Sequence, residues 1–179
     1  MKKFGIITIG LFLVLSVSSG FAQLKIGYVD SQRILQEYQE AIDAQNKLEE
    51  IRAQYQAEYE SKVREYQEMA QSIESQSLLL SEEKKQEKMK KAQDLALQID
   101  KYKYDKLGPE GEYYRKNIEL TKPIIEKINN IIKTIGDNEE YDFILDASQG
   151  ALLHALPKYD LTENVLAELN KGVSSTSKK

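Results

Sequence analysis

The residues able to carry out acid–base or metal chemistry are one histidine and a few paired carboxylates. His154 lies beside Leu152 and Leu153 in an apolar segment, which favours a structural role over that of a catalytic base. Asp142 and Asp146 are close in sequence, but Asp146 begins a turn, where aspartate commonly bonds the backbone. No cluster of His, Asp and Glu residues has metal-ligand spacing. The sequence contains no cysteine, which excludes thiolate chemistry. We therefore expect no catalytic, cofactor or metal site, and no enzyme activity.

The stretch Gly108-Pro109-Glu110-Gly111 is the one glycine-rich segment that could suggest phosphate binding. It follows a predicted helix rather than a strand and lacks a following Lys-Ser/Thr pair, so it does not match a phosphate loop. Its four residues predict instead an interruption of a helix. Both a flexing joint and a local bulge are compatible with that interruption.

Aromatic and basic side chains at helical spacing are better candidates for binding. The tyrosines are either coiled-coil core with the hydroxyl reaching water, or a surface that binds extended apolar chains weakly and without sequence preference. The residues predicted to contact such a chain are Tyr55, Tyr59, Tyr66, Met69 and Tyr102. A second set, which is either a solvated helix face or a contact for an anionic surface, comprises Lys84, Lys85, Lys88 and Lys91.

Most of these residues belong to a long helical pattern. No glycine or proline occurs between Gly27 and Gly108, and from Leu35 to Ile73 the apolar seam advances 38 residues in 11 steps, or about 3.5 per step. A helix from Ser31, as N-cap, to about Ser75 would span ~68 Å, far beyond a compact body of this size, and must project. With a tip at about 76–81 and a return arm ending with Gly136 at C′, residues 31–136 are predicted to form an antiparallel helical hairpin.

The two ends of the chain are predicted to form a small β body. Residues 23–30 suggest a first strand, and residues 137–171 a β-hairpin, pairing 141–145 with 151–155, followed by a short helix from Asp160. Residues 172–179 are expected to be a disordered tail. The fold class is therefore α+β. Such a body is too small to be stable alone, which predicts an obligate homo-oligomer. Its core would contain Ile26, Tyr28, Tyr141, Phe143, Leu145 and Leu153.

The first 22 residues are predicted to be a cleaved signal peptide. They combine Lys2 and Lys3, an apolar run and a small-residue site ending at Ala22. Their loss would remove two lysines and move the net charge from −4 to −6. This mildly acidic, intermixed charge argues against a nucleic-acid partner.

Two segments at opposite ends of the chain carry a family resemblance. One is KIGYVD at residues 25–30, and the other runs from YDFILDASQGALLHA at residue 141 to the DLTENVLAEL helix. With a signal peptide and a helical hairpin in the same order, the chain resembles the Skp (OmpH-like) family of periplasmic chaperones over essentially its whole mature length. The resemblance implies that short strands of three subunits build one β barrel, from which three helical hairpins surround a cavity.

The resemblance also implies a function. The expected protein is an ATP-independent holdase of the Gram-negative periplasm, a homotrimer without cofactor that binds unfolded outer-membrane β-barrel proteins and prevents their aggregation. The best-studied members are strongly basic, so the net charge of −6 here implies at most weak contact with a membrane surface. The alternative is a structural or adaptor coiled coil of the cell envelope with one specific folded partner.

Overall fold

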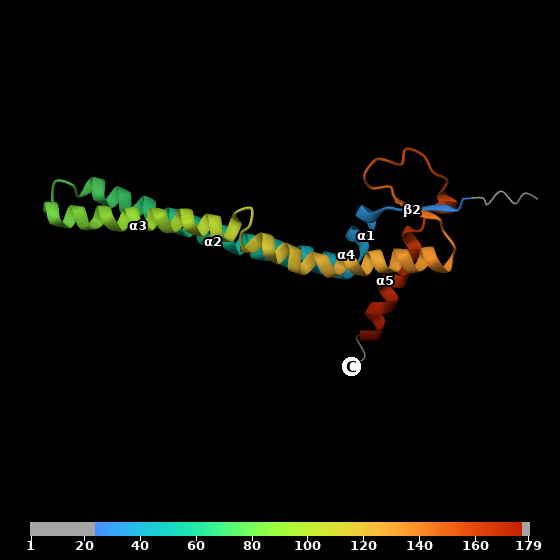
Figure 1. The fold of residues 1–179 in the computed structure, drawn as a ribbon. Helices are drawn as coiled ribbons and strands as arrows, with labels where there is room; N and C mark the ends of the chain where they lie inside the picture. Colours follow the sequence, from blue (N-terminus) through green and yellow to red (C-terminus); the bar gives the residue numbers. More distant parts are fainter. Residues whose placement is uncertain (1–23, 177–179) are drawn as a thin grey trace, which may run out of the picture.

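The computed structural model describes residues 24–176, so the predicted signal peptide lies outside the described residues. A long two-helix arm projects from a small body that contains both ends of the described chain (Figure 1). The elements are, in order, β1 (Ile26–Val29), α1 (Ser31–Glu37), α2 (Gln39–Ser75), α3 (Glu82–Leu107), α4 (Glu112–Asn138), β2 (Phe143–Asp146), the 3-10 helix η1 (Pro157–Tyr159) and α5 (Thr162–Thr176). The predicted fold class, a small β body with a helical hairpin, is confirmed for the single chain.

The distal arm is an antiparallel pair of α2 and α3. The chain reverses after Ser75, and the Ser81 hydroxyl caps α3 by accepting a hydrogen bond from the Lys84 N–H. Lys88 Nζ reaches back to Ser72 Oγ at 3.1 Å, and this contact sets the register near the tip. Near the tip, α3 is thus held to α2 by a contact between two side chains that are 16 residues apart in sequence.

The proximal arm pairs α2 with α4, because α3 ends at Leu107 and a new helix begins at Glu112. Gly108 is required at this break, since a Cβ there would collide with the Tyr104 carbonyl oxygen. Pro123 lies inside α4. The predicted interruption of the return arm therefore exists, with the unbroken α2 running alongside it.

The predicted single helix from residue 31 to 75 is wrong at one point. Tyr38 has extended backbone angles, φ −77° and ψ 120°, and separates α1 from α2. Its side chain is fully buried, and Lys127 Nζ on α4 donates to its hydroxyl at 2.6 Å. The predicted N-cap Ser31 is also wrong, since the Asp30 side chain accepts from the Arg33 N–H and Ser31 is already helical.

The sheet contains two strands in the described chain, and the predicted β-hairpin is wrong. β1 and β2 pair in parallel, with Ile26 opposite Phe143, and the whole arm forms the crossover between them. Residues 151–156 form no strand. The edge of β1 away from β2 meets instead the segment before α5, where the Leu161 N–H donates to the Tyr28 carbonyl at 2.8 Å. Strand pairing within the chain therefore joins its two ends.

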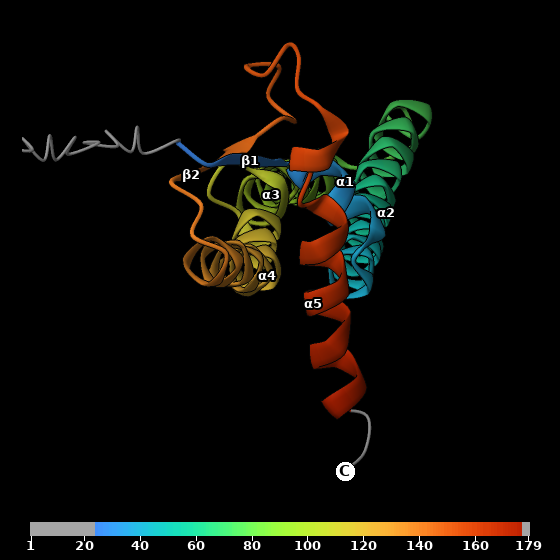
Figure 2. The same cartoon turned by 90° about the vertical axis from the view of Figure 1, so that its right-hand side faces the viewer.

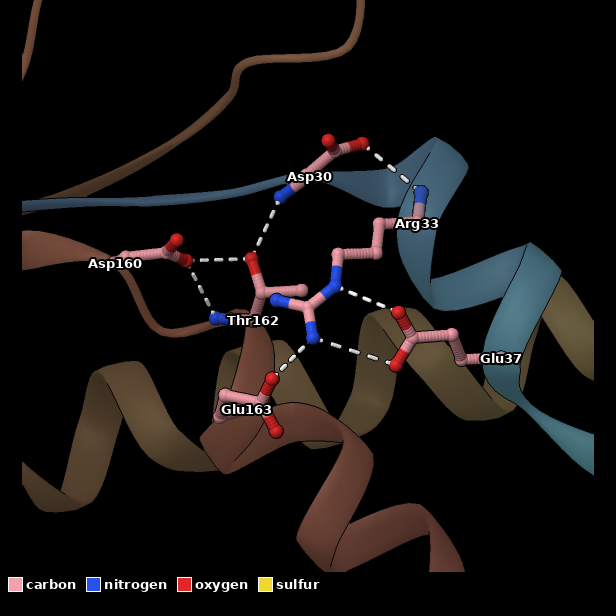
Figure 3. Close-up of polar contacts among 6 residues, drawn as sticks. All are labelled: Asp30, Arg33, Glu37, Asp160, Thr162 and Glu163. Carbon is pink, nitrogen blue, oxygen red and sulfur yellow. Dashed lines mark hydrogen bonds and ion pairs between the residues drawn. The ribbon is translucent and has the colours of Figure 1, made fainter. Parts of the chain in front are cut away.

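The two ends of the chain are fastened by a polar cluster as well as by this pairing (Figure 3). The buried Thr162 hydroxyl accepts from the Asp30 N–H at 3.0 Å and donates to the Asp160 carboxylate at 2.5 Å. Arg33 bridges two carboxylates, those of Glu37 on its own helix and Glu163 on α5. The KIGYVD and DLT segments of the family resemblance thus meet at one place.

The core lies beneath the sheet, among α1, the start of α2, α4 and α5. Its buried residues include Val29, Ile34, Ile128, Val165 and Leu169. Figure 2 shows α5 running from the sheet past the base of the arm. One face of the sheet is covered by this core, and the other is not.

Two helix ends differ from the sequence prediction. Gly136 is not at C′ but inside α4, which ends at Asn138. Glu140 takes the left-handed conformation with φ 57°, and the Tyr141 N–H donates to the Gly136 carbonyl at 3.0 Å. This is a Schellman-type end with a non-glycine residue at C′. The second difference is at the end of α5. This helix continues to Thr176, beyond residue 172, where the disordered tail was predicted to begin.

Candidate functional site

The outer face of the two-stranded sheet is an exposed apolar surface. Ile26 and Phe143 lie opposite each other in the register, and Leu145 follows two residues later on the same face. All three are exposed, Phe143 by 55%. Their neighbours Gly27 and Val29 face the core, so alternation along the strands produces one buried and one bare apolar face. We call Ile26, Phe143 and Leu145 the sheet face.

The other residues predicted for an oligomer core differ in how far they are buried. Tyr28 is partly buried, and burial followed by the charge of Asp160 raises the pKa of its hydroxyl. Tyr141 packs against the core with the Lys25 ammonium 4.0 Å from its ring centroid. Leu153 is 93% exposed in the loop after β2. Tyr28 and Tyr141 are thus partly buried within the chain, and of these three residues only Leu153 is exposed.

The tyrosines and the methionine predicted to contact an extended chain are divided between the inside and the surface of the arm. Tyr55 is only 8% exposed, while Tyr59, Met69 and Tyr102 are partly buried. Tyr66 is 37% exposed and lines a shallow groove between α2 and α3, shared with Met89 and Ile73. Of the five, Tyr66 is therefore the side chain most open to a ligand.

The interior tyrosines take part in a polar network beside the helix break. The Tyr102 hydroxyl donates to Glu58 Oε2 at 2.7 Å, and burial followed by this carboxylate raises the pKa of Tyr102. The same bond, with a second from Gln54, lowers the pKa of Glu58. The Tyr102 hydroxyl thus fastens α3 to α2.

The Gly108–Gly111 break is bridged by charged residues on both of its sides. Lys106, at the end of α3, forms an ion pair with Glu112, at the start of α4. The Lys106 ammonium also lies 5.0 Å from the ring centroid of Tyr55 on α2. The pKa of Glu112 is lowered, first by Lys106 and then by the Tyr55 hydroxyl. We call Tyr55, Lys106 and Glu112 the joint cluster.

The predicted anionic-surface lysines near the tip are partly engaged within the arm. Lys88 donates to Ser72 and to Gln76 Oε1 at 2.9 Å, and Lys91 pairs with Glu87 at 2.6 Å. Lys84 is exposed and Lys85 partly buried. Two of the four lysines are thus paired within the arm.

The structure exposes apolar residues at the tip that the sequence interpretation passed over. Leu78 is 97% exposed, and Leu79 is also exposed, in the turn between α2 and α3. The signal was available, since three consecutive leucines at a predicted reversal have no helix face to pack on. Within residues 24–176, no helix has the length and apolar character needed to cross a membrane.

Hollows at the root of the arm are lined by further residues that sequence reasoning did not identify as a site. One of these hollows is bounded by Leu35 of α1, Gln45 and Leu48 of α2, and Thr121 and Ile125 of α4. The wide apolar stripe of α4 was the available signal, because it implied contacts on more than one side of that helix. Which residues of α2 lie opposite it depends on the pairing of distant segments.

Comparison with protein families gives one match that covers most of the chain. The family described as "Outer membrane protein (OmpH-like)" matches residues 25–169. These limits include both the KIGYVD segment and the start of α5, as well as the whole arm. The match therefore extends over body and arm together.

Two curated relatives span nearly the full length. An uncharacterized protein of Aquifex aeolicus (strain VF5) is 26% identical over 172 residues, covering 96% of this chain and 98% of its own. The chaperone protein Skp of Yersinia enterocolitica is 24% identical over 173 residues, covering 94% of this chain and 99% of its own. The similarity is low but extends from end to end.

One solved structure shares the fold. A crystal structure of an OmpH-like outer membrane chaperone from Caulobacter crescentus CB15 has a TM-score of 0.72, covering 86% of this chain and 88% of that chain. The two sequences are 16% identical, so this likeness concerns the fold alone.

Proposed function

The chain belongs to the OmpH-like family, and on that premise we propose that it is an ATP-independent holdase chaperone of the Gram-negative periplasm. Its clients are unfolded outer-membrane β-barrel proteins, which it keeps from aggregating. It needs no cofactor and catalyses no reaction. Any contact with a membrane surface is weak, since two of the tip lysines are engaged within the arm.

The observation that carries this proposal is the number of large apolar side chains exposed along the arm. Scattered single exposed residues are ordinary, but a projecting arm with many of them offers repeated weak contacts to an unfolded chain. Several weak contacts made together hold a client and still permit its release without ATP. The exposed arm residues are Tyr66, Leu78, Leu79, Met89, Leu97, Tyr104, Tyr114, Ile118 and Ile125.

A homotrimer is part of the same proposal. The sheet face presents apolar side chains on a two-stranded sheet, and such a small sheet needs further strands or a covering partner for stability. Association of the sheet faces of several copies would remove Phe143 and its neighbours from water. The number three comes from the family resemblance.

The test is the light scattering of an outer-membrane β-barrel protein diluted from urea. The full mature chain in trimer-equivalent amounts is expected to suppress the scattering of several unrelated clients. An equal mass of serum albumin serves as the control. If scattering is unchanged and the chain instead binds a single folded envelope protein, the adaptor function replaces the holdase.

A further inference from the structure

A groove with an apolar floor runs along the root of the arm between α2 and α4. Its central part has a volume of about 390 Å³. Leu48 forms part of a buried floor, whereas Leu35 and Ile125 stand on the walls and remain exposed. Nothing else in the described part of the chain fills this space. We call it the root groove.

The rim of the central part of the root groove is polar but uncharged. Gln45 projects from α2, and Asn117 and Thr121 project from α4. Thr121 donates its hydroxyl proton to the Asn117 carbonyl at 2.8 Å, so its oxygen is left as an acceptor. The side-chain amide of Gln45 makes no hydrogen bond within residues 24–176, and it can both donate and accept. No lining residue of this central part carries a charge.

The root groove continues in both directions. Toward the body, a hollow that shares Leu35 and Gln45 extends to Gln149 in the loop after β2. Toward the tip, a hollow that shares Gln45 and Leu48 extends to Gln56. From Gln45 to Gln56 a helix rises ~16 Å, which matches about five residues of extended chain at ~3.3 Å each.

The chemistry of the root groove fits an extended polypeptide better than the other occupants. An extended segment has free main-chain N–H and C=O groups, which side-chain amides can bond without regard to sequence, and its apolar side chains can reach the floor. In a helix of a second copy, the main-chain N–H and C=O groups are already hydrogen-bonded to each other. Such a helix would leave the amide rim without main-chain partners. An anionic lipid surface would require cations, which the central groove does not have.

We propose that the root groove binds extended apolar segments of unfolded clients through its apolar floor and amide rim. This inference rests on the proposed holdase function and specifies where on the arm a client chain binds. It adds a contact on the face shared by α2 and α4 to those of the exposed apolar side chains along the arm. The groove then holds a chain by its backbone, which every client shares.

Site-specific photocrosslinking tests this assignment directly. The natural sequence contains no cysteine, so Gln45→Cys can carry a benzophenone maleimide as the sole label. Asn46→Cys is the matched control, because Asn46 is also an exposed side-chain amide and is next in sequence, but lines none of the hollows. The full mature chain is mixed with a urea-unfolded outer-membrane β-barrel protein and irradiated. Several-fold more client adduct is expected from position 45 than from position 46.

Two results would overturn the inference while leaving the holdase function intact. The first is equal adduct from both positions in samples that suppress light scattering equally well. The second is adduct from position 45 mainly between two copies of this chain, which would make a second copy the occupant. A protein that suppresses no scattering contradicts the proposed function itself, and the inference with it.

The role of the amide rim is tested by a variant that keeps the shape of the groove. Gln45→Leu combined with Asn117→Leu removes hydrogen-bonding groups and adds apolar surface at similar volume. We expect several-fold more chaperone to be needed for half-suppression of scattering, with the circular dichroism spectrum unchanged. Asn46→Leu, which replaces an amide outside the groove, should have no effect. If the double variant holds clients as well as the natural chain, recognition through the backbone is wrong.

Discussion

The Tyr102 hydroxyl donates a 2.7 Å hydrogen bond to the carboxylate of Glu58, which lies 44 residues earlier in the chain. Fourteen residues toward the tip on each helix, Lys88 bonds Ser72 at 3.1 Å. The two contacts define a constant register between α2 and α3. They also place Tyr102 between the helices, where its hydroxyl has a partner from the arm itself.

The positions of Tyr55 and Tyr66 predict losses of stability of different size for the same substitution. Tyr55→Ser removes a buried ring and should lower the free energy of unfolding by about 3 kcal/mol. Tyr66→Ser removes an exposed ring and should cost less than about 1 kcal/mol. Urea unfolding followed by circular dichroism measures both. Equal losses would show that the two rings are equally packed in solution, contrary to the structure.

Phe143→Asp is expected to dissociate the proposed trimer. The substitution places a carboxylate in the middle of the sheet face, where association would have to bury it without a partner. Sedimentation velocity should give a smaller or unfolded species across micromolar concentrations. Leu97→Asp is the control, because Leu97 is also exposed but lies on α3 in the arm. A natural chain that sediments as a stable folded monomer would refute the trimer.

The register of the arm permits a shortening that preserves its packing. Deleting residues 58–71 and 89–102 removes fourteen residues, two heptads, from each helix and should shorten the arm by ~21 Å. The tip and the body remain, so the oligomer should still assemble. Suppression of aggregation should weaken most for large clients. Full protection of large clients by the shortened protein would exclude the distal arm from client binding.

The joint cluster predicts that acid loosens the arm at residues 108–111. Folding lowers the pKa of Glu112 below its usual value of 4.5, so its ion pair with Lys106 stabilises the fold above that pH. This stabilisation is lost as the pH falls through the lower folded pKa. Spin labels at Gln98→Cys and Lys122→Cys, diluted with unlabelled protein, should report a broader distance distribution at pH 3 than at pH 7.

Glu112→Gln should broaden the same distance distribution already at pH 7, because it removes the charge that Lys106 binds. Glu119→Gln is the matched control, since Glu119 pairs with Lys116 within α4 and does not bridge the break. Identical narrow distributions for all three proteins at pH 7 would mean that the ion pair does not hold the joint.

Local sequence signals were sufficient for the long elements. The three-four spacing and the absence of glycine and proline predicted a helix too long for a compact body, and α2 alone runs from Gln39 to Ser75. Serine caps and helix breakers act within a few residues of themselves, so Ser81 and Gly108 marked their helix ends in the sequence. The apolar alternation around Phe143 likewise predicted a strand without distant information.

Tertiary structure decided what depended on distant partners. Tyr38 interrupts the first helix although no residue there breaks helices, and its buried hydroxyl bonds Lys127 of α4. β2 pairs with β1 across the whole arm, not with the apolar segment that follows it, since strand alternation is the same for either partner. Seam spacing could not separate Tyr55 from Tyr66, because periodicity gives the face of a helix and not how closely its neighbour approaches. The root groove likewise exists only where the flanks of α2 and α4 meet.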